Sequence, residues 1–521
     1  MDGLRPMAAH PSRGFAEEER EGKNCAWRPA IPTRLRIGDL LIRGKVVTEE
    51  GVNRAIERQS IDGGRLGDCL IANGAITRQG LDDFLHRLPA EPASVEATGV
   101  DGPELMGLLM KLIYTSRLET VGQFADAIKL PYHITIDLVQ MAIDRKLLMS
   151  LGARDGGNLG ELAYALTDEG SRWTLELTSR AGYVGPAPVT LGDFTHQVNL
   201  QKLSNEVITY ERIRKCAAAL TLSDSMIEQC GPAINSGRAM LLYGLPGNGK
   251  TSLAHCLASV FDDVIYVPYA IVVDGQIIRV FDPSIHIAID PAELKEDSSF
   301  SLVRRDPFDL RWCACRRPFV IAGGELTLDL LDLRYDPSCH FYEAPLHMKA
   351  INGCFIIDDF GHQLISPVSL LNRWIVPLEN RIDYLKLHTG KTFSIPFEVL
   401  IIFSTNLEPK DLMDGAFLRR LPYKIEVGTP SLEAFRKIFE KECAKAGLQL
   451  TREVFETIVY KIKTEKSAEL ACYQPKFIVD QVVAACRFMQ QQTHFEARFI
   501  SYAVDNLCVK DIGNSTSARA A

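Results

Sequence analysis

The sequence has no run of about 18 apolar residues, the length that a membrane-spanning helix requires, so it predicts no transmembrane segment. Its first 32 residues lack the apolar stretch of a signal peptide and predict a disordered tail. The formal net charge of −8 gives no basic excess of the kind that coats nucleic acid or anionic membranes. These absences predict a protein of the cytoplasm.

The cysteine pattern also lacks the features of a disulfide framework. The 13 cysteines are odd in number and scattered through apolar segments, which is typical of reduced thiols in a cytosolic protein. The stretches CAC (313–315) and SCH (338–340) fit no common zinc-finger spacing, so they predict buried thiols and no zinc site. At 521 residues, with 46% apolar residues, the chain is long enough for several domains.

An internal repeat opens the ordered part of the chain, which we place at residues 33–90. Residues 36–59 and 65–88 align without gaps at a period of 29 residues. Each unit predicts a short amphipathic helix, a turn and a second helix, with Thr48 and Thr77 as the N-caps of the second helices. The plainest interpretation is a helical hairpin that was duplicated for packing.

The repeat resembles the tandem cyclic-di-GMP-binding units of type II secretion and type IV pilus ATPases. That family shows R-L-G-x-x-L-x-x-x-G and a terminal Gln in units separated by five residues, as here. Two positions depart from the pattern, because Lys45 replaces a Gly and Leu88 replaces the second Gln. An arginine can stack on guanine and hydrogen-bond to its edge, so the resemblance implies a cyclic-di-GMP site, with a docking module as the alternative. The residues on motif positions are Arg36, Gly38, Gln59, Arg65, Gly67 and Gly74.

Residues 103–181 predict a winged-helix-like module that follows a Pro- and Ala-rich linker at 88–104. Three apolar-periodic helices, a Gly-rich hairpin and a last helix capped by Thr167 form the pattern. DNA binding through the third helix, 132–148, is one interpretation. However, the module has 8 basic and 10 acidic side chains, so it lacks the phosphate-neutralising charge that DNA binding needs. The charge favours a protein partner over DNA. A second linker, 181–191, follows.

A Gly-rich loop between an apolar strand and a helix, at residues 239–258, carries the sequence G-x-x-x-x-G-K-T. Backbone N–H groups of such a loop surround phosphate oxygens, its lysine reaches the β- and γ-phosphates, and its threonine hydroxyl binds Mg²⁺. The loop therefore predicts ATP and Mg²⁺ as ligands. The residues assigned to nucleotide binding are Gly244, Pro246, Gly247, Asn248, Gly249, Lys250, Thr251 and Ser252.

Two acids follow the buried strand at 354–357. Two adjacent acids at the end of a strand suggest a metal ion and a water to activate. Asp358 is placed to hold Mg²⁺ together with Thr251, and Asp359 is placed to act as the base that activates the water. The second acid is usually Glu, and Asp is one methylene shorter, so we expect slow hydrolysis. Asn406 ends another buried strand, which begins at residue 397.

The segments GLPGNGKTSLA, GCFIIDD, FSTN and AFLRR resemble those of AAA+ ATPases, in the same order, over about residues 200–510. The resemblance implies a homo-hexamer with ATP at subunit interfaces. It implies that Asn406 positions the attacking water and that Arg419 or Arg420 reaches the γ-phosphate of the neighbouring subunit. Lys476 stands where the family has a second-sensor arginine.

The predicted fold class is multidomain. An α-helical repeat, a winged helix (α+β), an α/β P-loop core at 195–428 and an α-helical lid at 429–510 precede a disordered tail at 511–521. The predicted function is Mg-ATP hydrolysis that remodels or moves an unidentified protein client, under cyclic-di-GMP control. The alternatives are a secretion or pilus motor and an ATP-switched, DNA-binding transcription regulator. The position of FSTN and AFLRR after the acids favours AAA+ over the motor.

Cyclic di-GMP should bind a fragment that spans residues 30–92, because both arginines of the repeat are retained. Isothermal titration calorimetry measures this binding directly. A folded fragment that releases no heat at ligand concentrations on the order of 10 µM, where even a weak specific site would fill, would reduce the repeat to a docking module.

Overall fold

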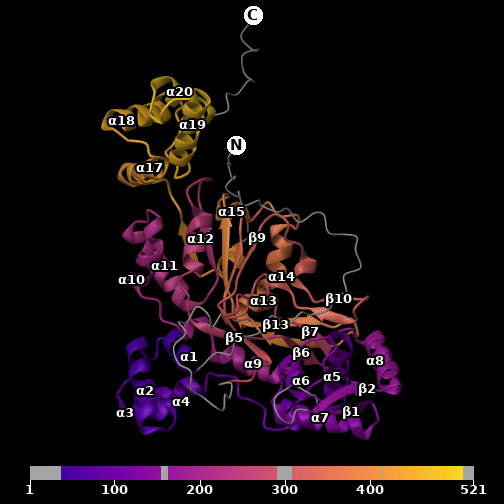
Figure 1. The fold of residues 1–521 in the computed structure, drawn as a ribbon. Coiled ribbons are helices and arrows are strands. Elements are labelled where there is room, and N and C mark those ends of the chain that lie inside the picture. Colours follow the sequence, from indigo (N-terminus) through magenta and orange to yellow (C-terminus); the bar gives the residue numbers. More distant parts are fainter. Residues whose placement is uncertain (1–36, 154–161, 290–307, 413–414, 508–521) are drawn as a thin grey trace, which may run out of the picture.

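The computed structural model describes residues 37–153, 162–289, 308–412 and 415–507. Figure 1 shows the four N-terminal helices and the α5–α8 module at one end, a central α/β part, and the helices α17–α20 at the other end. Among the described residues, no helix has both the length and the apolar character needed to cross a membrane.

The N-terminal repeat forms four short helices. Their bounds are α1 (Ile37–Arg43), α2 (Glu49–Asp62), α3 (Leu66–Ala72) and α4 (Arg78–Leu85). Thr48 and Thr77 cap α2 and α4 by accepting hydrogen bonds from Gly51 N and Gly80 N, the third residue of each helix, which confirms both predicted caps. Leu40, Leu41 and Leu70 are fully buried, so the apolar faces of the helices pack together.

The next module has three helices, an antiparallel hairpin and a fourth helix. Their bounds are α5 (Gly102–Ser116), α6 (Val121–Ile128), α7 (Tyr132–Asp144), β1 (Leu148–Ala153), β2 (Leu162–Leu166) and α8 (Asp168–Arg180). Thr167 caps α8 by accepting from Gly170 N, as predicted. The third helix was expected to reach residue 148. It ends at Asp144 because Lys146 takes a positive φ of 60° and Leu148 pairs in β1.

A five-stranded sheet of parallel pairs forms the α/β core, in the order β16-β4-β15-β12-β9. The strands are β4 (Met240–Tyr243), β9 (Phe319–Ala322), β12 (Cys354–Ile357), β15 (Leu400–Thr405) and β16 (Tyr423–Glu426). Met240 and Leu242 face one core cluster and Leu241 faces another, so helices cover both faces of the sheet. The carboxyl ends of the strands therefore meet at one edge.

Helices on the two faces complete this layered core. Those packed with Met240 and Leu242 are α10 (Tyr210–Cys216), α11 (Asp224–Ser236) and α12 (Lys250–Ala258). On the opposite face, α14 (Pro367–Asn380) buries Trp374 against Phe355 and Phe403. The short helix α13 (Leu346–Lys349) precedes β12.

The range predicted as one core also contains a second five-stranded sheet, in the order β10-β11-β7-β6-β3. Its strands are β3 (Val189–Thr190), β6 (Ala270–Val273), β7 (Gln276–Arg279), β10 (Arg334–Asp336) and β11 (Phe341–Glu343). Asp274 and Gly275, both with positive φ, form the β6–β7 turn, which confirms the predicted hairpin.

Two further strand pairs and the helix α9 (Leu191–Leu200) lie beside these sheets. The pairs are β5 (Val264–Pro268) with β8 (Trp312–Arg316), and β13 (Ile382–Lys386) with β14 (Thr392–Pro396). The interval between the P-loop and the two acids is long because it contains the strand pair of β5 with β8 and four of the five strands of the second sheet.

The C-terminal helices form their own core. They are α17 (Leu432–Ala446), α18 (Arg452–Tyr460), α19 (Gln474–Phe488) and α20 (Ala497–Leu507), preceded by the short α15 (Pro409–Leu412) and α16 (Gly415–Leu418). Phe435, Phe439 and Ile478 are fully buried among them. No strand occurs in the described part of 429–507.

One buried ion pair holds both of the segments that were predicted as linkers. Arg311 Nε donates to Asp309 Oδ2 at 2.9 Å, and both side chains are buried. Arg311 Nη1 donates to Thr98 O at 3.0 Å in the first segment and to Pro188 O at 3.2 Å in the second. The winged-helix-like module is therefore attached to the core at both of its ends.

Arg311→Ala should lower the free energy of unfolding by about 3–5 kcal/mol, because it leaves the Asp309 carboxylate buried without its cation. Urea-induced unfolding of the full chain measures the change. Arg334→Ala, at an exposed arginine of β10, is the matched control and should change the value by less than about 0.5 kcal/mol. Equal changes in the two variants would contradict this role of Arg311.

Candidate nucleotide site

The loop between β4 and α12 requires glycine at two positions. Gly244 has a φ of 139°, and a Cβ there would lie 2.5 Å from Val427 O. Gly247 has a φ of 78°, and a Cβ there would lie 2.3 Å from the Tyr473 ring. Both the backbone conformation and the close contacts exclude other residues at these two positions. Without a Cβ atom at either position, a phosphate can approach the backbone N–H groups of the loop.

Lys250 is buried at the centre of this loop. Its Nζ donates to Gly244 O and Leu245 O, both at 2.9 Å, and to Asn406 Oδ1 at 2.7 Å. Desolvation lowers the pKa of Lys250, while the charges of Asp358 and Asp359 act in the opposite direction. An ammonium held by neutral carbonyls in a desolvated loop suits the binding of an anion such as a phosphate.

Thr251 and Asp358 form the predicted metal pair. Thr251 Oγ1, in the first turn of α12, lies 3.0 Å from Asp358 Oδ1 and 2.9 Å from Oδ2. Asp358 directly follows β12, and its backbone N–H donates to Ala322 O at the end of β9. A hydroxyl and a carboxylate at this spacing are the hard oxygen ligands that Mg²⁺ prefers, so the residues fit this ion.

Asp359 and Asn406 also meet at this edge. Asn406 Nδ2 donates to Asp359 Oδ1 at 3.0 Å, so Asn406 bridges the carboxylate and Lys250. Sequence reasoning missed His362, whose Nδ1 lies 3.2 Å from the same Oδ1 atom. The sequence feature that could have indicated His362 is its position just after Gly361, in the turn that follows the two acids.

Asn248 gives an independent test of whether the loop suits a polar ligand. Its side chain is only 5% exposed, and both Oδ1 and Nδ2 lack a hydrogen-bond partner among the described residues. Buried polar atoms without partners are rare and costly, so a ligand that supplies them is favoured. Pro246 lies in the same loop as Asn248, and Ser252 lies in the first turn of α12.

The two arginines lie apart from these residues within one chain. Arg419 and Arg420 follow α16 and line a cleft of about 460 Å³ that includes no P-loop residue. Arg420 Nε donates to Glu379 Oε1 at 2.6 Å. Arg419 is exposed and has no recorded partner among the described residues. The other residues lining the cleft are Arg238, Leu378, Glu379 and Pro422.

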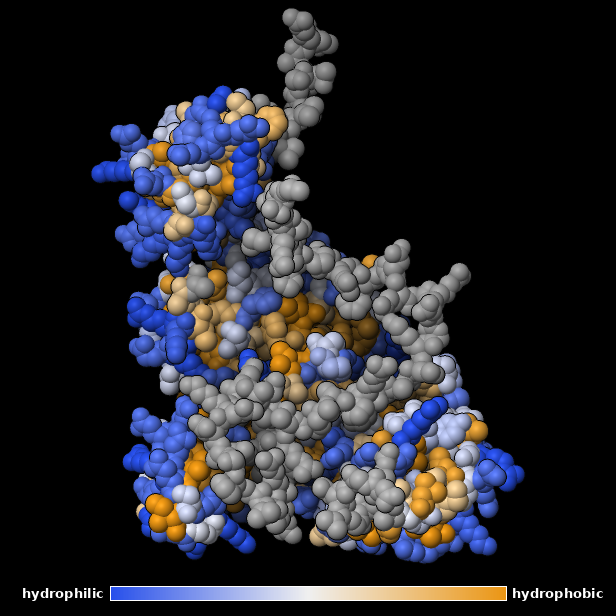
Figure 2. Space-filling model, in the orientation of Figure 1, coloured by the Kyte–Doolittle hydropathy of each residue, from blue (hydrophilic) through white to orange (hydrophobic). Residues whose placement is uncertain are grey.

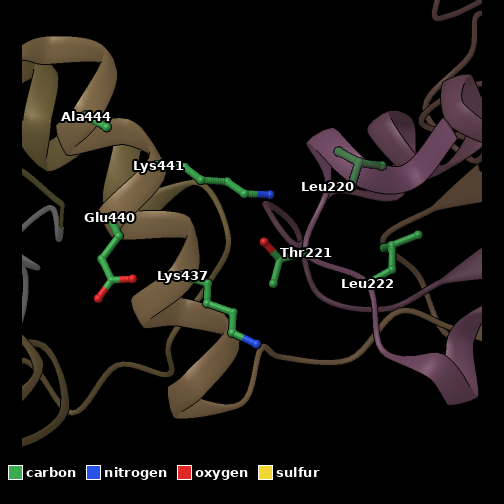
Figure 3. A pocket seen from close by; sticks show the side chains of 7 residues that line it. All are labelled: Leu220, Thr221, Leu222, Lys437, Glu440, Lys441 and Ala444. Atoms are coloured by element: carbon green, nitrogen blue, oxygen red, sulfur yellow. The ribbon is translucent and has the colours of Figure 1, made fainter. Parts of the chain in front are cut away.

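The C-terminal helices contact the core at the P-loop and at a second point. Tyr473, at the start of α19, donates its N–H to Gly247 O at 3.0 Å, and Lys476 lies one turn further with an exposed side chain. Lys441 of α17 donates to Ala218 O at 3.1 Å. Beside this contact lies a cleft of about 520 Å³ between α17 and the segment before α11. Figure 3 shows the side chains that line it. Its lining residues are Leu220, Thr221, Leu222, Lys437, Glu440, Lys441 and Ala444.

The residues assigned to cyclic di-GMP have mixed surroundings. Gln59 Nε2 donates to Gly64 O at 2.8 Å, which ties α2 to the interval between the units. Arg65, at the N-cap of α3, is exposed and has no recorded side-chain partner among the described residues. Gly74 has a φ of 68° in a turn. Arg36 lies outside the described residues.

The other two glycines of the repeat are packing positions. A Cβ at Gly38 would lie 3.0 Å from Val52, and a Cβ at Gly67 would lie 2.8 Å from Leu81. Lys45, which departs from the repeat pattern, pairs with Asp262 of the core at 2.6 Å. The repeat therefore contacts the segment that follows α12.

Comparisons with known proteins find one domain family that matches part of the chain, and solved structures of low sequence identity. Residues 431–506, which span α17–α20, match a domain of unknown function (DUF8689). No curated protein matches the chain.

Similar solved structures include a RuvB mutant from Thermotoga maritima, at 12% identity and a TM-score of 0.29, covering 59% of this chain and 73% of that chain. The FIGL-1 AAA domain with ADP has 13% identity and a TM-score of 0.29, covering 59% and 81%. NtrX from Brucella abortus with ADP has 11% identity and a TM-score of 0.30, covering 55% and 56%. At these scores, the description of the core as an α/β P-loop fold rests on its own loop and parallel sheet.

If Arg419 is the arginine finger that the resemblance implies, Arg419→Ala should leave ATP binding unchanged and lower turnover by roughly 10³-fold, because the finger acts on the γ-phosphate of another subunit. Arg420→Ala should have the smaller effect, since Glu379 already holds that guanidinium. Phosphate release and nucleotide titration measure the two effects. Mixing the Arg419→Ala and Asp359→Ala chains should restore part of the activity, and no recovery at any ratio would contradict a shared site.

Proposed function

We propose that this chain is an AAA+ ATPase that binds Mg-ATP and hydrolyses it slowly. The observation that carries the proposal is the hydrogen-bonded set Lys250–Asn406–Asp359, beside the Thr251–Asp358 pair. A P-loop lysine, a metal pair, a base and a water-positioning amide meet at one sheet edge, which is the set that phosphoryl transfer to water requires.

Each side chain has a role that its chemistry allows. Lys250 balances phosphate charge, and Asp359 accepts a proton from the attacking water. Asn406 orients that water, since its amide can both donate and accept. Mg²⁺, held by Thr251 and Asp358, would neutralise charge on the phosphate oxygens.

We propose a homo-hexamer as the working assembly. Within one chain, Arg419 and Arg420 lie in a cleft that includes no P-loop residue, so the proposed arginine finger has to come from a neighbouring copy. Lys476 is proposed to act from the lid, where α19 begins beside Gly247. As a lysine, it supplies charge without the planar fork of arginine.

We propose that hydrolysis remodels or moves a protein client, and that the repeat regulates it through cyclic di-GMP. The surface of the winged-helix-like module favours a protein partner over DNA. Ile136 of α7 and Met149, Leu151 and Leu162 of the hairpin are exposed, and Figure 2 shows hydrophobic colour over this module. Exposed apolar groups of this kind are typical of protein contacts. The secretion motor and the DNA-binding regulator remain the alternatives.

Asp359→Asn should bind ATP with wild-type affinity and lose most of its turnover, because the amide cannot accept the proton of water. Asp359→Glu should keep or raise activity, since the longer side chain brings the carboxylate closer to the water. Titration with a fluorescent ATP analogue and release of inorganic phosphate measure the two properties.

Three further variants control this experiment. Lys250→Ala should lose ATP binding, Asp358→Asn should weaken Mg-ATP binding, and Asp144→Asn, on α7 away from the site, should behave as wild type. Wild-type turnover in Asp359→Asn would refute its assignment as the base. Unchanged nucleotide affinity in Lys250→Ala would refute the loop as the nucleotide site.

A further inference from the structure

The middle of the P-loop has its recorded partner in the C-terminal helices. Both ends of the loop are fixed within the core, because Lys250 Nζ donates to the carbonyls of residues 244–245 at 2.9 Å and a backbone N–H of α12 donates to Gly249 O at 2.8 Å. Between these ends, the only backbone hydrogen bond recorded among the described residues joins Gly247 O to Tyr473 N at 3.0 Å. The conformation of the middle of the loop therefore depends on the start of α19.

The Tyr473 ring packs on the same glycine. A Cβ at Gly247 would lie 2.3 Å from Tyr473 Cδ1 and 2.9 Å from Cε1, so one edge of the ring lies against the Gly247 Cα atom. An apolar ring beside the N–H···O bond limits the access of water to it, and a hydrogen bond is stronger where the local dielectric is low. The ring and the backbone bond therefore hold Gly247 together.

A fixed turn presents Tyr473 to the loop. Gln474, which begins α19, is buried, and its Nε2 donates to Glu469 O at 2.9 Å while its Oε1 accepts from Ala471 N at 3.0 Å. Ile478, one turn further along, is fully buried in the core of the C-terminal helices. Because the turn and the helix are both held, the Tyr473 N–H leaves Gly247 O only when α19 moves or when the loop changes its conformation.

The loop has unused hydrogen-bond donors beside this contact. Among the described residues, no hydrogen bond is recorded for the backbone N–H groups of Gly247, Asn248 and Gly249. The C=O and N–H groups of one trans peptide point in opposite directions, so the bond between Gly247 O and Tyr473 directs the Asn248 N–H away from α19. The buried Asn248 side chain also lacks a partner among these residues. A phosphate in the loop supplies the acceptor that such N–H groups need.

We infer that Tyr473 is a positioning residue for the nucleotide: through Gly247 it holds the P-loop in the conformation that accepts phosphate, and it couples the C-terminal helices to nucleotide binding. This inference rests on the proposed ATPase function. Tyr473 acts through the loop and not on the reacting atoms, so it changes the affinity for ATP and leaves the chemical step as it is. The coupling is reciprocal, because a nucleotide that fixes the loop also favours the contact with α19.

The tyrosine ring, and not its hydroxyl, makes the contact with Gly247, which defines the substitutions that test it. Tyr473→Ala removes the ring and keeps the backbone N–H, whereas Tyr473→Phe removes only the hydroxyl. The Tyr473 side chain is 45% exposed, so neither change empties a buried position. Tyr502 of α20, which is 62% exposed, gives the matched control for the loss of a tyrosine ring from the same group of helices.

We compare the ATP affinity and steady-state hydrolysis of the full chain with those of the Tyr473→Ala, Tyr473→Phe and Tyr502→Ala chains. Tyr473→Ala should raise the Kd of a fluorescent ATP analogue and the KM for ATP about tenfold, the value of burying roughly half of an aromatic side chain, and leave kcat within about twofold. Tyr473→Phe should keep the wild-type affinity because the ring remains, and Tyr502→Ala should match the wild type.

Hydrogen–deuterium exchange of the wild-type chain tests the coupling without a substitution. Mg-ATP should slow exchange in the first turns of α19, and this protection should be weaker in Tyr473→Ala at saturating nucleotide. Exchange in α19 that does not respond to nucleotide, an unchanged Kd in Tyr473→Ala, an equal loss of affinity in Tyr473→Phe, or a lowered kcat with constant KM would each overturn the inference. A wild-type chain that binds no nucleotide would instead overturn the proposed function itself.

Discussion

The position of β15 between β4 and β12 is the constraint on which the candidate site depends. Parallel pairing on both sides of β15 brings three carboxyl ends to one edge, so Lys250 and Asn406 bond although 156 residues separate them. These strands are buried on both faces, and a slip of one residue would turn every side chain to the opposite face. The apolar cores of both layers therefore fix the register of the site.

Asn406 is the neutral group that joins the cation and the anion of the site. Its Oδ1 accepts from Lys250 and its Nδ2 donates to Asp359, and no side chain of a single charge provides both functions. An aspartate there would repel Asp359, and a lysine would repel Lys250. The amide allows the Lys250 ammonium and the Asp359 carboxylate to lie close together in a partly desolvated loop without a direct ion pair between them.

The N-terminal modules are part of the folded body and are not attached by free linkers. The buried Arg311–Asp309 pair holds both connecting segments, and residues of the repeat belong to the same apolar cluster as Ile265 and Tyr342. The Lys45–Asp262 pair is half exposed, so it contributes little to stability on its own. Apolar contact therefore attaches the repeat to the region that follows the P-loop helix.

The sequence by itself determined the parts of the site that short-range chemistry specifies. The glycines, Lys250 and Thr251 are local to one loop, and Asp358, Asp359 and Asn406 each follow an apolar run that reads as a buried strand. The helix caps Thr48, Thr77 and Thr167 are also local, because a capping side chain contacts the backbone only two or three residues away.

Only the tertiary structure decided which distant groups meet. No local pattern indicates that Arg311 fastens the two linkers, since its acceptors lie 213 and 123 residues away. The second sheet was not predicted as a unit, although its β6–β7 hairpin was, because β3, this hairpin and the β10–β11 pair come from three separated segments that meet only after folding. His362 follows the acids closely, yet its contact depends on the positive φ of Asp359, which long-range bonds to β15 hold and no residue preference predicts.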